Sequence, residues 1–205
     1  YGADTVHVRR REKFQNIRLK GRLRMEIGQH QFRTRGQYFP AGRYQGDFKW
    51  RGALHISLDS VQQVQAGYRA QRRQPDFLYK QMQSNHLSWS SSLDRPIVNQ
   101  VFGMYQHQTL NLNARLTYNL MNNFTYYDEN IEPSQQKAPL NTIALNLKHR
   151  FQVGPFYWHN KLLLQEFSNP DIVRMPNWLY RSSLYYKQSL FDDNLLLSAG
   201  LDFRY

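Results

Sequence analysis

The sequence predicts an all-β protein, an antiparallel up-and-down β-barrel whose strands cross a membrane. Three observations lead to this fold class. Apolar and polar residues alternate over long segments, turn-forming residues separate these segments, and no apolar run is long enough for a membrane-spanning helix. We count about 10–12 strands by this alternation, either a small barrel or a fragment of a larger one.

The first predicted strand covers residues 17–28, IRLKGRLRMEIG. The odd-numbered positions, which we call one parity, are apolar except for Gly21: they are Ile17, Leu19, Leu23, Met25 and Ile27. The other parity is charged: Arg18, Lys20, Arg22, Arg24 and Glu26. Successive side chains of a strand point to opposite faces, so this strand has one apolar face and one cationic face.

The same alternation predicts the later strands in order, at 48–58, 64–71, 110–126, 143–151, 156–165, 178–187 and 195–205. The connections predicted as short or middling lie at 58–60, 73–76, 106–109, 153–155 and 191–194, and the long ones at 39–46, 128–139 and 168–177. In the second half, short and long connections alternate, as in membrane barrels with tight periplasmic turns and longer outer loops.

A soluble β-sandwich is the alternative fold, because its strands also alternate. Its strands average about 5–6 residues, whereas a tilted membrane strand needs about 9–11. The alternation over 17–27 and 110–126 exceeds the length typical of a sandwich strand. The membrane barrel is therefore favoured.

Composition limits the function classes. The chain has 205 residues, a formal charge of +12, a mean hydropathy of −0.74 and no cysteine. A basic chain suggests nucleic-acid binding, but here the charges alternate within strands. We therefore expect no nucleic-acid partner, and we divide the chain into a basic segment, 1–11, and a single domain of barrel strands, 12–205.

The parities predict three groups of site residues. The lumen-lining basic group comprises Arg18, Lys20, Arg22, Arg24, Arg33, Arg35, Lys49, Arg51 and Arg69. The lipid-facing group comprises Ile17, Leu19, Leu23, Met25, Leu112 and Leu116. The aromatic residues expected at the membrane interfaces are Trp50, Trp158, Trp178, Tyr118 and Tyr126.

No catalytic or metal-binding constellation is predicted. The seven histidines are scattered, and none has two further ligands at metal spacing. His86 lies near Ser88 and Ser90, and some barrel enzymes use a serine and a histidine together in catalysis. The favoured interpretation of His86 is nevertheless a polar residue of the lumen. We expect no enzyme activity, no metal and no cofactor.

Residues 85–205 carry a family resemblance. It rests on NHLSW (85–89), LNARLTYNLMNNFTYYD (112–128), NKLLLQEFSNPDIVRMPNWLYRSSLYY (160–186) and LFDDNLLLSAGLDFRY (190–205). In these segments the chain resembles the putative-porin family of Bacteroidota outer-membrane β-barrels. Members of that family look longer than this chain, so the resemblance implies either an unusually small barrel or a fragment of a larger one.

Ser198, Gly200, Phe203 and Tyr205 fit the pattern of a terminal strand recognised by the barrel-assembly machinery, although one more amphipathic strand explains them equally well.

The expected function is passive passage of small hydrophilic solutes through a cationic, anion-preferring lumen in the cell outer membrane. The expected partners are outer-membrane lipid and the assembly machinery. Two alternatives stay open: a plugged structural barrel associated with other outer-membrane proteins, and a soluble β-rich binder of nucleic acid or glycan.

Overall fold

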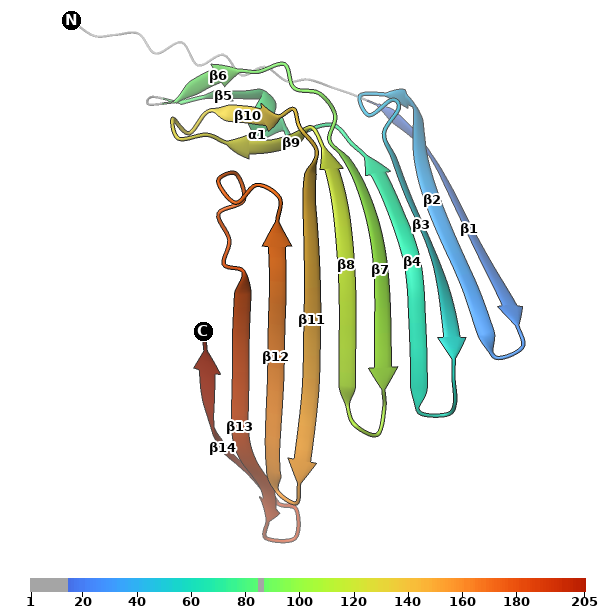
Figure 1. The fold of residues 1–205 in the computed structure, drawn as a ribbon, viewed down its shortest axis with the longest axis vertical. Coiled ribbons are helices and arrows are strands. Elements are labelled where there is room, and N and C mark those ends of the chain that lie inside the picture. The colour runs from blue at the N-terminus through green and yellow to red at the C-terminus, as the bar shows by residue number, and fades with distance from the viewer. Residues whose placement is uncertain (1–14, 85–86) are drawn as a thin grey trace, which may run out of the picture.

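A computed structural model describes residues 15–84 and 87–205. Most of them form one antiparallel sheet of ten strands, each paired with the strand before it in the sheet (Figure 1). In sheet order these are β1 (Asn16–Ile27), β2 (His30–Gly42), β3 (Phe48–Ser57), β4 (Gln62–Arg72), β7 (Ile97–His107), β8 (Leu112–Asn122), β11 (Leu140–Val153), β12 (Phe156–Phe167), β13 (Trp178–Leu190) and β14 (Leu195–Arg204). The predicted all-β, antiparallel, up-and-down architecture is confirmed. The predicted basic segment 1–11 lies outside the described residues.

Two connections carry small elements of their own. Residues 73–96 contain the one-turn helix α1 (Phe77–Lys80) and a hairpin of β5 (Gln81–Gln83) and β6 (Ser88–Ser90). Residues 123–139 contain a second hairpin, of β9 (Phe124–Tyr127) and β10 (Pro133–Gln136). No helix among the described residues has the length and apolar character needed to cross a membrane.

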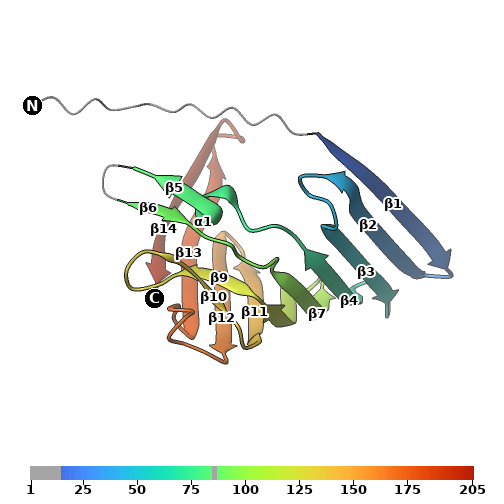
Figure 2. The same cartoon turned by 90° about the horizontal axis from the view of Figure 1, so that it is seen from above.

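The large sheet curves into an arc. Figure 2 shows the strands following one another around a trough, with β1 and β14 as the two edges. Within the described residues these edge strands do not pair with each other, so the arc is an open wall and no closed barrel is formed. Ten strands in one up-and-down sheet agree with the predicted 10–12.

The connections differ at the two ends of the sheet. Tight turns, at residues 28–29, 58–61, 108–111, 154–155 and 191–194, lie at the lower end in Figure 1, and longer connections lie at the upper end. Asp59 shapes one tight turn: its carboxylate accepts the Val61 and Gln62 N–H groups at 2.8 and 2.6 Å, which lowers its pKa. The alternation predicted for the second half thus extends over the whole chain.

The structure corrects several of the predicted connections and strands. β2 continues to Gly42, so the predicted long loop 39–46 shrinks to 43–47. The predicted short connection 73–76 is in fact the excursion 73–96. The predicted strand 110–126 ends at Asn122, because Asn123 has a left-handed φ of 56° and turns the chain into β9. No strand range was predicted for β2 or for β7, although Arg33 and Arg35 of β2 were predicted to line the lumen.

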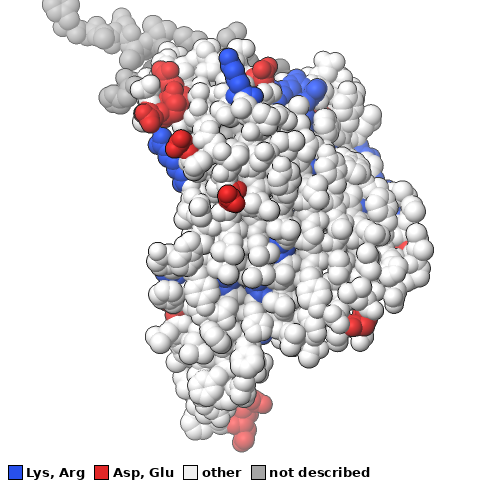
Figure 3. All heavy atoms as spheres, in the orientation of Figure 1, with Lys and Arg blue, Asp and Glu red and all other residues white. Residues whose placement is uncertain are grey.

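The sheet has an uncovered apolar face. Ala53, Phe102 and Leu140 are the buried hydrophobic residues among those described, while many large apolar side chains are exposed. Figure 3 views the convex side of the arc: charged side chains gather toward its ends and are sparse across its middle. A soluble protein rarely exposes an apolar surface of this extent, whereas a bilayer would cover it.

Candidate functional site: the cationic concave face

The polar parity of the strands lies on the concave face of the arc. Arg51 of β3 and Arg115 of β8 both place their guanidinium carbons over the ring of Phe102 in β7, at 5.0 and 4.8 Å. β4 separates β3 from β7 in the sheet. Side chains from non-adjacent strands can meet over one ring only on the concave face of a curved sheet. The cationic positions of the strands therefore face the inside of the arc.

The strand register places four arginines in one row. Arg22 of β1 is directly opposite Arg35 of β2, Arg35 is opposite Arg51 of β3, and Arg51 is opposite Arg69 of β4. Directly opposite residues share a face, with Cβ atoms about 4.5–5.5 Å apart. We call these four residues the arginine ladder.

Further cations flank the arginine ladder on both sides. Arg24 is directly opposite Arg33, and Lys20 and Lys49 are each opposite Gln37. Arg24 has a carboxylate partner, since it donates to Glu26 at 2.5 and 3.0 Å. The eight predicted lumen residues from Lys20 to Arg69 therefore form one patch on β1–β4, and Arg18, at the register shift between Ile17 and Leu19, extends it.

No carboxylate neutralises the arginine ladder in the described part of the chain. Its polar partner among the described residues is neutral: Arg69 donates to Gln71 at 2.6 Å, while the Nε atom of Arg69 is buried without a hydrogen bond. Like charges directly opposite each other destabilise a sheet, and two unit charges 4 Å apart repel by about 1 kcal/mol even in water. The sheet holds the four cations together against this repulsion.

Two hollows open over the arginine ladder. One, of about 730 Å³, is lined by Arg22, Arg24, Arg33, Arg35, Arg51, His55 and Gln65 among others. Its neighbour, of about 490 Å³, is lined by Lys20, Arg22, Arg35, Gln37, Lys49 and Arg51 among others. Arg22, Arg35 and Arg51 line both hollows, and neither lining includes an acidic residue.

A second row of cations was not singled out from the sequence. Lys148, Lys161, Arg181 and Arg204 are directly opposite one another on β11–β14. Asp202 neutralises part of this row, because its carboxylate lies 2.7 Å from Arg181 and 3.0 Å from Arg204. The alternation placed these residues on the polar parity, but only the register shows that they form a row.

The apolar parity lies on the convex face, where five of the six predicted lipid-facing residues are exposed and Leu112 is half-buried. Leu23 is 52% exposed and Leu116 is 50% exposed. The register relates the two strands: Leu23 is connected through Thr34, Gly52, Tyr68 and Val101 to Tyr118, which has the same parity as Leu116. These residues therefore share one face of the sheet.

Aromatic residues mark both ends of the convex face. Trp50 and Trp178 lie at strand starts on the long-loop end, and Trp158 lies near the start of β12 at the tight-turn end. Tyr118 is further from its strand end, opposite Val101. Tyr126 differs from the prediction: it belongs to β9, which pairs with β10 outside the large sheet, so it lies on no long strand. The cause is the turn at Asn123.

Comparison with protein families agrees with this architecture. A family model described as "Putative porin" matches residues 1–205, which is the whole chain. The chain belongs to this porin family. No protein with a curated description matches it significantly. Membership favours a non-enzymatic channel.

The porin wall carries a folded structure at its long-loop end. Gln135 of β10 accepts the Asp94 N–H at 3.0 Å and donates to the Asp94 carbonyl at 2.8 Å, and the rings of Tyr79 and Tyr127 stack 4.7 Å apart. These contacts join the two excursions into one unit. We call residues 73–84, 87–96 and 123–139 the rim platform. Figures 1 and 2 show its elements above the sheet, on the concave side of the arc.

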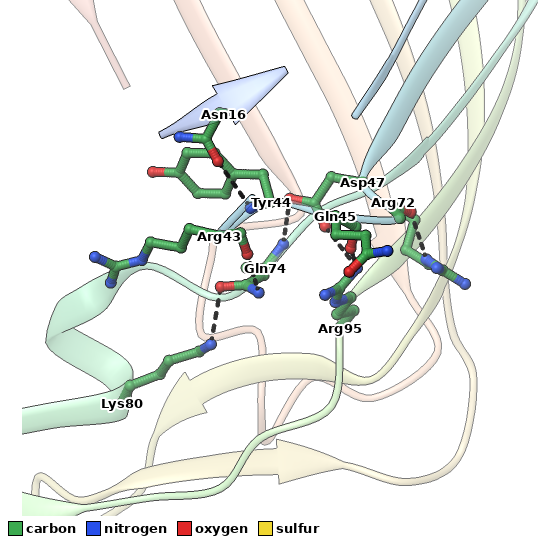
Figure 4. Close-up of polar contacts among 10 residues, drawn as sticks. Asn16, Arg43, Tyr44, Gln45, Asp47, Arg72, Gln74, Lys80 and Arg95 are labelled. Carbon is green, nitrogen blue, oxygen red and sulfur yellow. Dashed lines mark hydrogen bonds and ion pairs between the residues drawn. The ribbon is translucent and has the colours of Figure 1, made fainter. Parts of the chain in front are cut away.

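A polar network anchors the rim platform to the β2–β3 loop (Figure 4). Asp47, which is 5% exposed, accepts the Gln74 N–H at 2.9 Å and pairs with Arg95 at 3.2 Å. Gln74 donates to the Arg43 carbonyl at 2.7 Å and accepts from Lys80 at 3.1 Å. This network could not be predicted from the sequence, because most of its partners are far apart along the chain.

The remaining predicted positions stay predictions. His86 lies outside the described residues, and across 15–84 and 87–205 no group of three His, Asp or Glu side chains could hold a metal ion. Ser198, Gly200 and Phe203 lie in β14, and Tyr205 stacks on Trp178 at 4.2 Å. A Cβ atom at Gly200 would collide with the Cβ atom of Tyr185, so packing alone explains this glycine.

Proposed function

We propose that this chain forms the wall of an outer-membrane porin that passes small hydrophilic solutes and prefers anions. The two faces of the sheet carry the proposal. The convex face exposes apolar side chains between aromatic residues at its two ends, which suits contact with lipid. The concave face is cationic, which suits a water-filled lumen. Family membership supports the same function. Solutes pass by diffusion, so no cofactor or turnover is needed.

The anion preference follows from electrostatics. Positive charge along a water-filled lumen raises the local concentration of anions and lowers that of cations. Salt screens this effect, because the Debye length falls from about 10 Å at 0.1 M to about 3 Å at 1 M. The preference should therefore be strong in dilute salt and weak in concentrated salt.

The experiment measures location and selectivity on the full-length protein. The full-length protein should fractionate with outer membranes and remain in that fraction through salt and carbonate washes. In planar bilayers, a KCl gradient at low ionic strength should give a reversal potential that indicates chloride preference, and the preference should fall as salt rises. Release into the soluble fraction, or a cation preference, would contradict the proposal.

A plugged structural barrel is the second candidate, and the rim platform favours it. This unit lies over the long-loop end on the concave side, and in a closed barrel it would cover part of the entrance. Conductance separates the two candidates: a porin gives open channels from well-folded protein, and a plugged barrel gives none.

A further inference from the structure

The arginine ladder is more ordered than anion preference requires. A diffuse preference needs positive charges anywhere along the wall, whereas here Arg22, Arg35, Arg51 and Arg69 stand directly opposite one another on four adjacent strands. Their mutual repulsion is relieved when an anion lies between them. An arrangement that is costly when empty and favourable when occupied indicates a binding site.

We propose that the arginine ladder is a binding site for a small, multiply charged oxyanion; the proposal rests on the porin function, because the solute reaches the concave face through the lumen. The backbone positions of neighbouring cations are spaced about 4.8 Å across the strands and about 6.7 Å along them. A solute with two or more charged groups contacts several cations of this patch at once. Chloride contacts fewer.

The side-chain chemistry selects oxyanions. A guanidinium group donates in a planar fork that matches carboxylate and phosphate oxygens, and all four ladder residues are arginines. The amides of Gln37 and Gln71 on the same face add neutral hydrogen-bonding groups. The two hollows that share Arg22, Arg35 and Arg51 measure about 730 and 490 Å³, which suits small solutes.

The second row of cations on β11–β14 provides a contrast. Asp202 lies within 3.0 Å of both Arg181 and Arg204, so an internal carboxylate already satisfies those guanidinium groups. In the described residues the arginine ladder has no such partner. Asp202 thus satisfies the two arginines of the second row, whereas the guanidinium groups of the arginine ladder stay open to an external anion.

The experiment measures binding by titration calorimetry on the full-length protein in detergent at low salt. Sodium tripolyphosphate and citrate are the probes, and they distinguish phosphate from carboxylate as the preferred group. Arg35→Gln/Arg51→Gln should weaken the Kd of the better probe by about tenfold or more. Lys148→Gln/Lys161→Gln, which removes the same charge from the same face, should change the Kd little, because lysines lack the guanidinium forks on which the ladder depends.

Two outcomes would overturn the proposal: no saturable binding of either probe to the wild-type protein, or equal weakening by both double variants, which indicates a diffuse field. If Arg35→Gln/Arg51→Gln fails to fold, Arg35→Lys/Arg51→Lys keeps the charge and removes the forks. The ladder then predicts weaker binding, and an unchanged Kd overturns it.

Bilayer recordings separate this proposal from the porin function. Anion-preferring channels without saturable binding reject the arginine ladder alone. Saturable binding that depends on Arg35 and Arg51, without any channels, rejects the porin function and leaves the site.

Discussion

Arg22 and Leu23 are neighbours in β1 and lie on opposite faces of the sheet. Arg22 belongs to the arginine ladder on the concave face, and Leu23 is 52% exposed on the convex face. If lipid covers the convex face, the two positions meet different solvents although their backbones adjoin. The alternation of side chains alone assigns them.

Exchanging the polarity of these positions tests the assignment. An arginine on the lipid face near the midplane costs roughly 2–4 kcal/mol, so Leu23→Arg should impair folding into lipid vesicles. Arg22→Leu should fold nearly normally and weaken the anion preference. Leu23→Arg would also destabilise a soluble β-sandwich, in which this position would be buried in the core. Dye labelling at positions 22 and 23 therefore distinguishes the membrane barrel from the sandwich. The chain has no cysteine, and single cysteines at 22 and 23 can carry a dye. A lipid-dissolved quencher should reach the dye at 23 and not at 22; equal water accessibility of both sites would show that the membrane assignment is wrong.

The face of the sheet to which each side chain points could be predicted at most positions, because it follows from the alternation along any strand. It fails where the chain leaves the strand or breaks the pattern. Tyr126 was placed on a long strand because nothing in the alternation marks the left-handed turn at Asn123. β7 was missed because Phe102 and Met104 are apolar residues on the polar face, where Phe102 is covered by Arg51 and Arg115.

At the scale of elements, the nine connections of the large sheet differ in what holds them. Tight turns depend on local contacts, as at Asp59, and several were located from the sequence within a residue or two. The rim platform depends on distant partners: Asp47 with Arg95, and Asp94 with Gln135. A single sequence does not reveal such pairs, which is why this connection was expected to cover only 73–76, as a short or middling one.

Asp47 should hold the rim platform in place. Its carboxylate is buried and has two partners, so Asp47→Asn loses the ion pair to Arg95 and leaves that charge without its carboxylate. We expect faster chymotrypsin cleavage of the protein in vesicles near Phe77 and Tyr79, with the barrel strands still protected. Glu129→Gln is the matched control, because Glu129 is 86% exposed where it pairs with Arg174, and exposed pairs contribute little. Equal cleavage rates for the two variants would mean that Asp47 does not anchor this segment.

At the scale of the whole molecule, the strand register determines what the sequence alone cannot. Each of the four ladder arginines was predicted to line the lumen, but their alignment in one row depends on how four strands pair. A slip of the register would separate them. Curvature is also a property of the assembled sheet, and it is curvature that brings Arg51 and Arg115 to the same phenylalanine ring.

The open edges of the arc lead to the last prediction. Unpaired backbone groups cost several kcal/mol each in the hydrocarbon of a bilayer, so sheets that span it are closed. β1 and β14 each have one neighbour within the described residues, and we expect each to gain another strand in the membrane.

A closed barrel resists detergent without heat, so the full-length protein from outer membranes should migrate faster on a denaturing gel unheated than boiled. Chemical cross-linking before the gel identifies the source of the added strands: a single-chain mass indicates strands of the same protein, and a multiple of it indicates further copies. Identical mobility before and after boiling would mean that the edges stay open, and with it the membrane assignment of this sheet would fail.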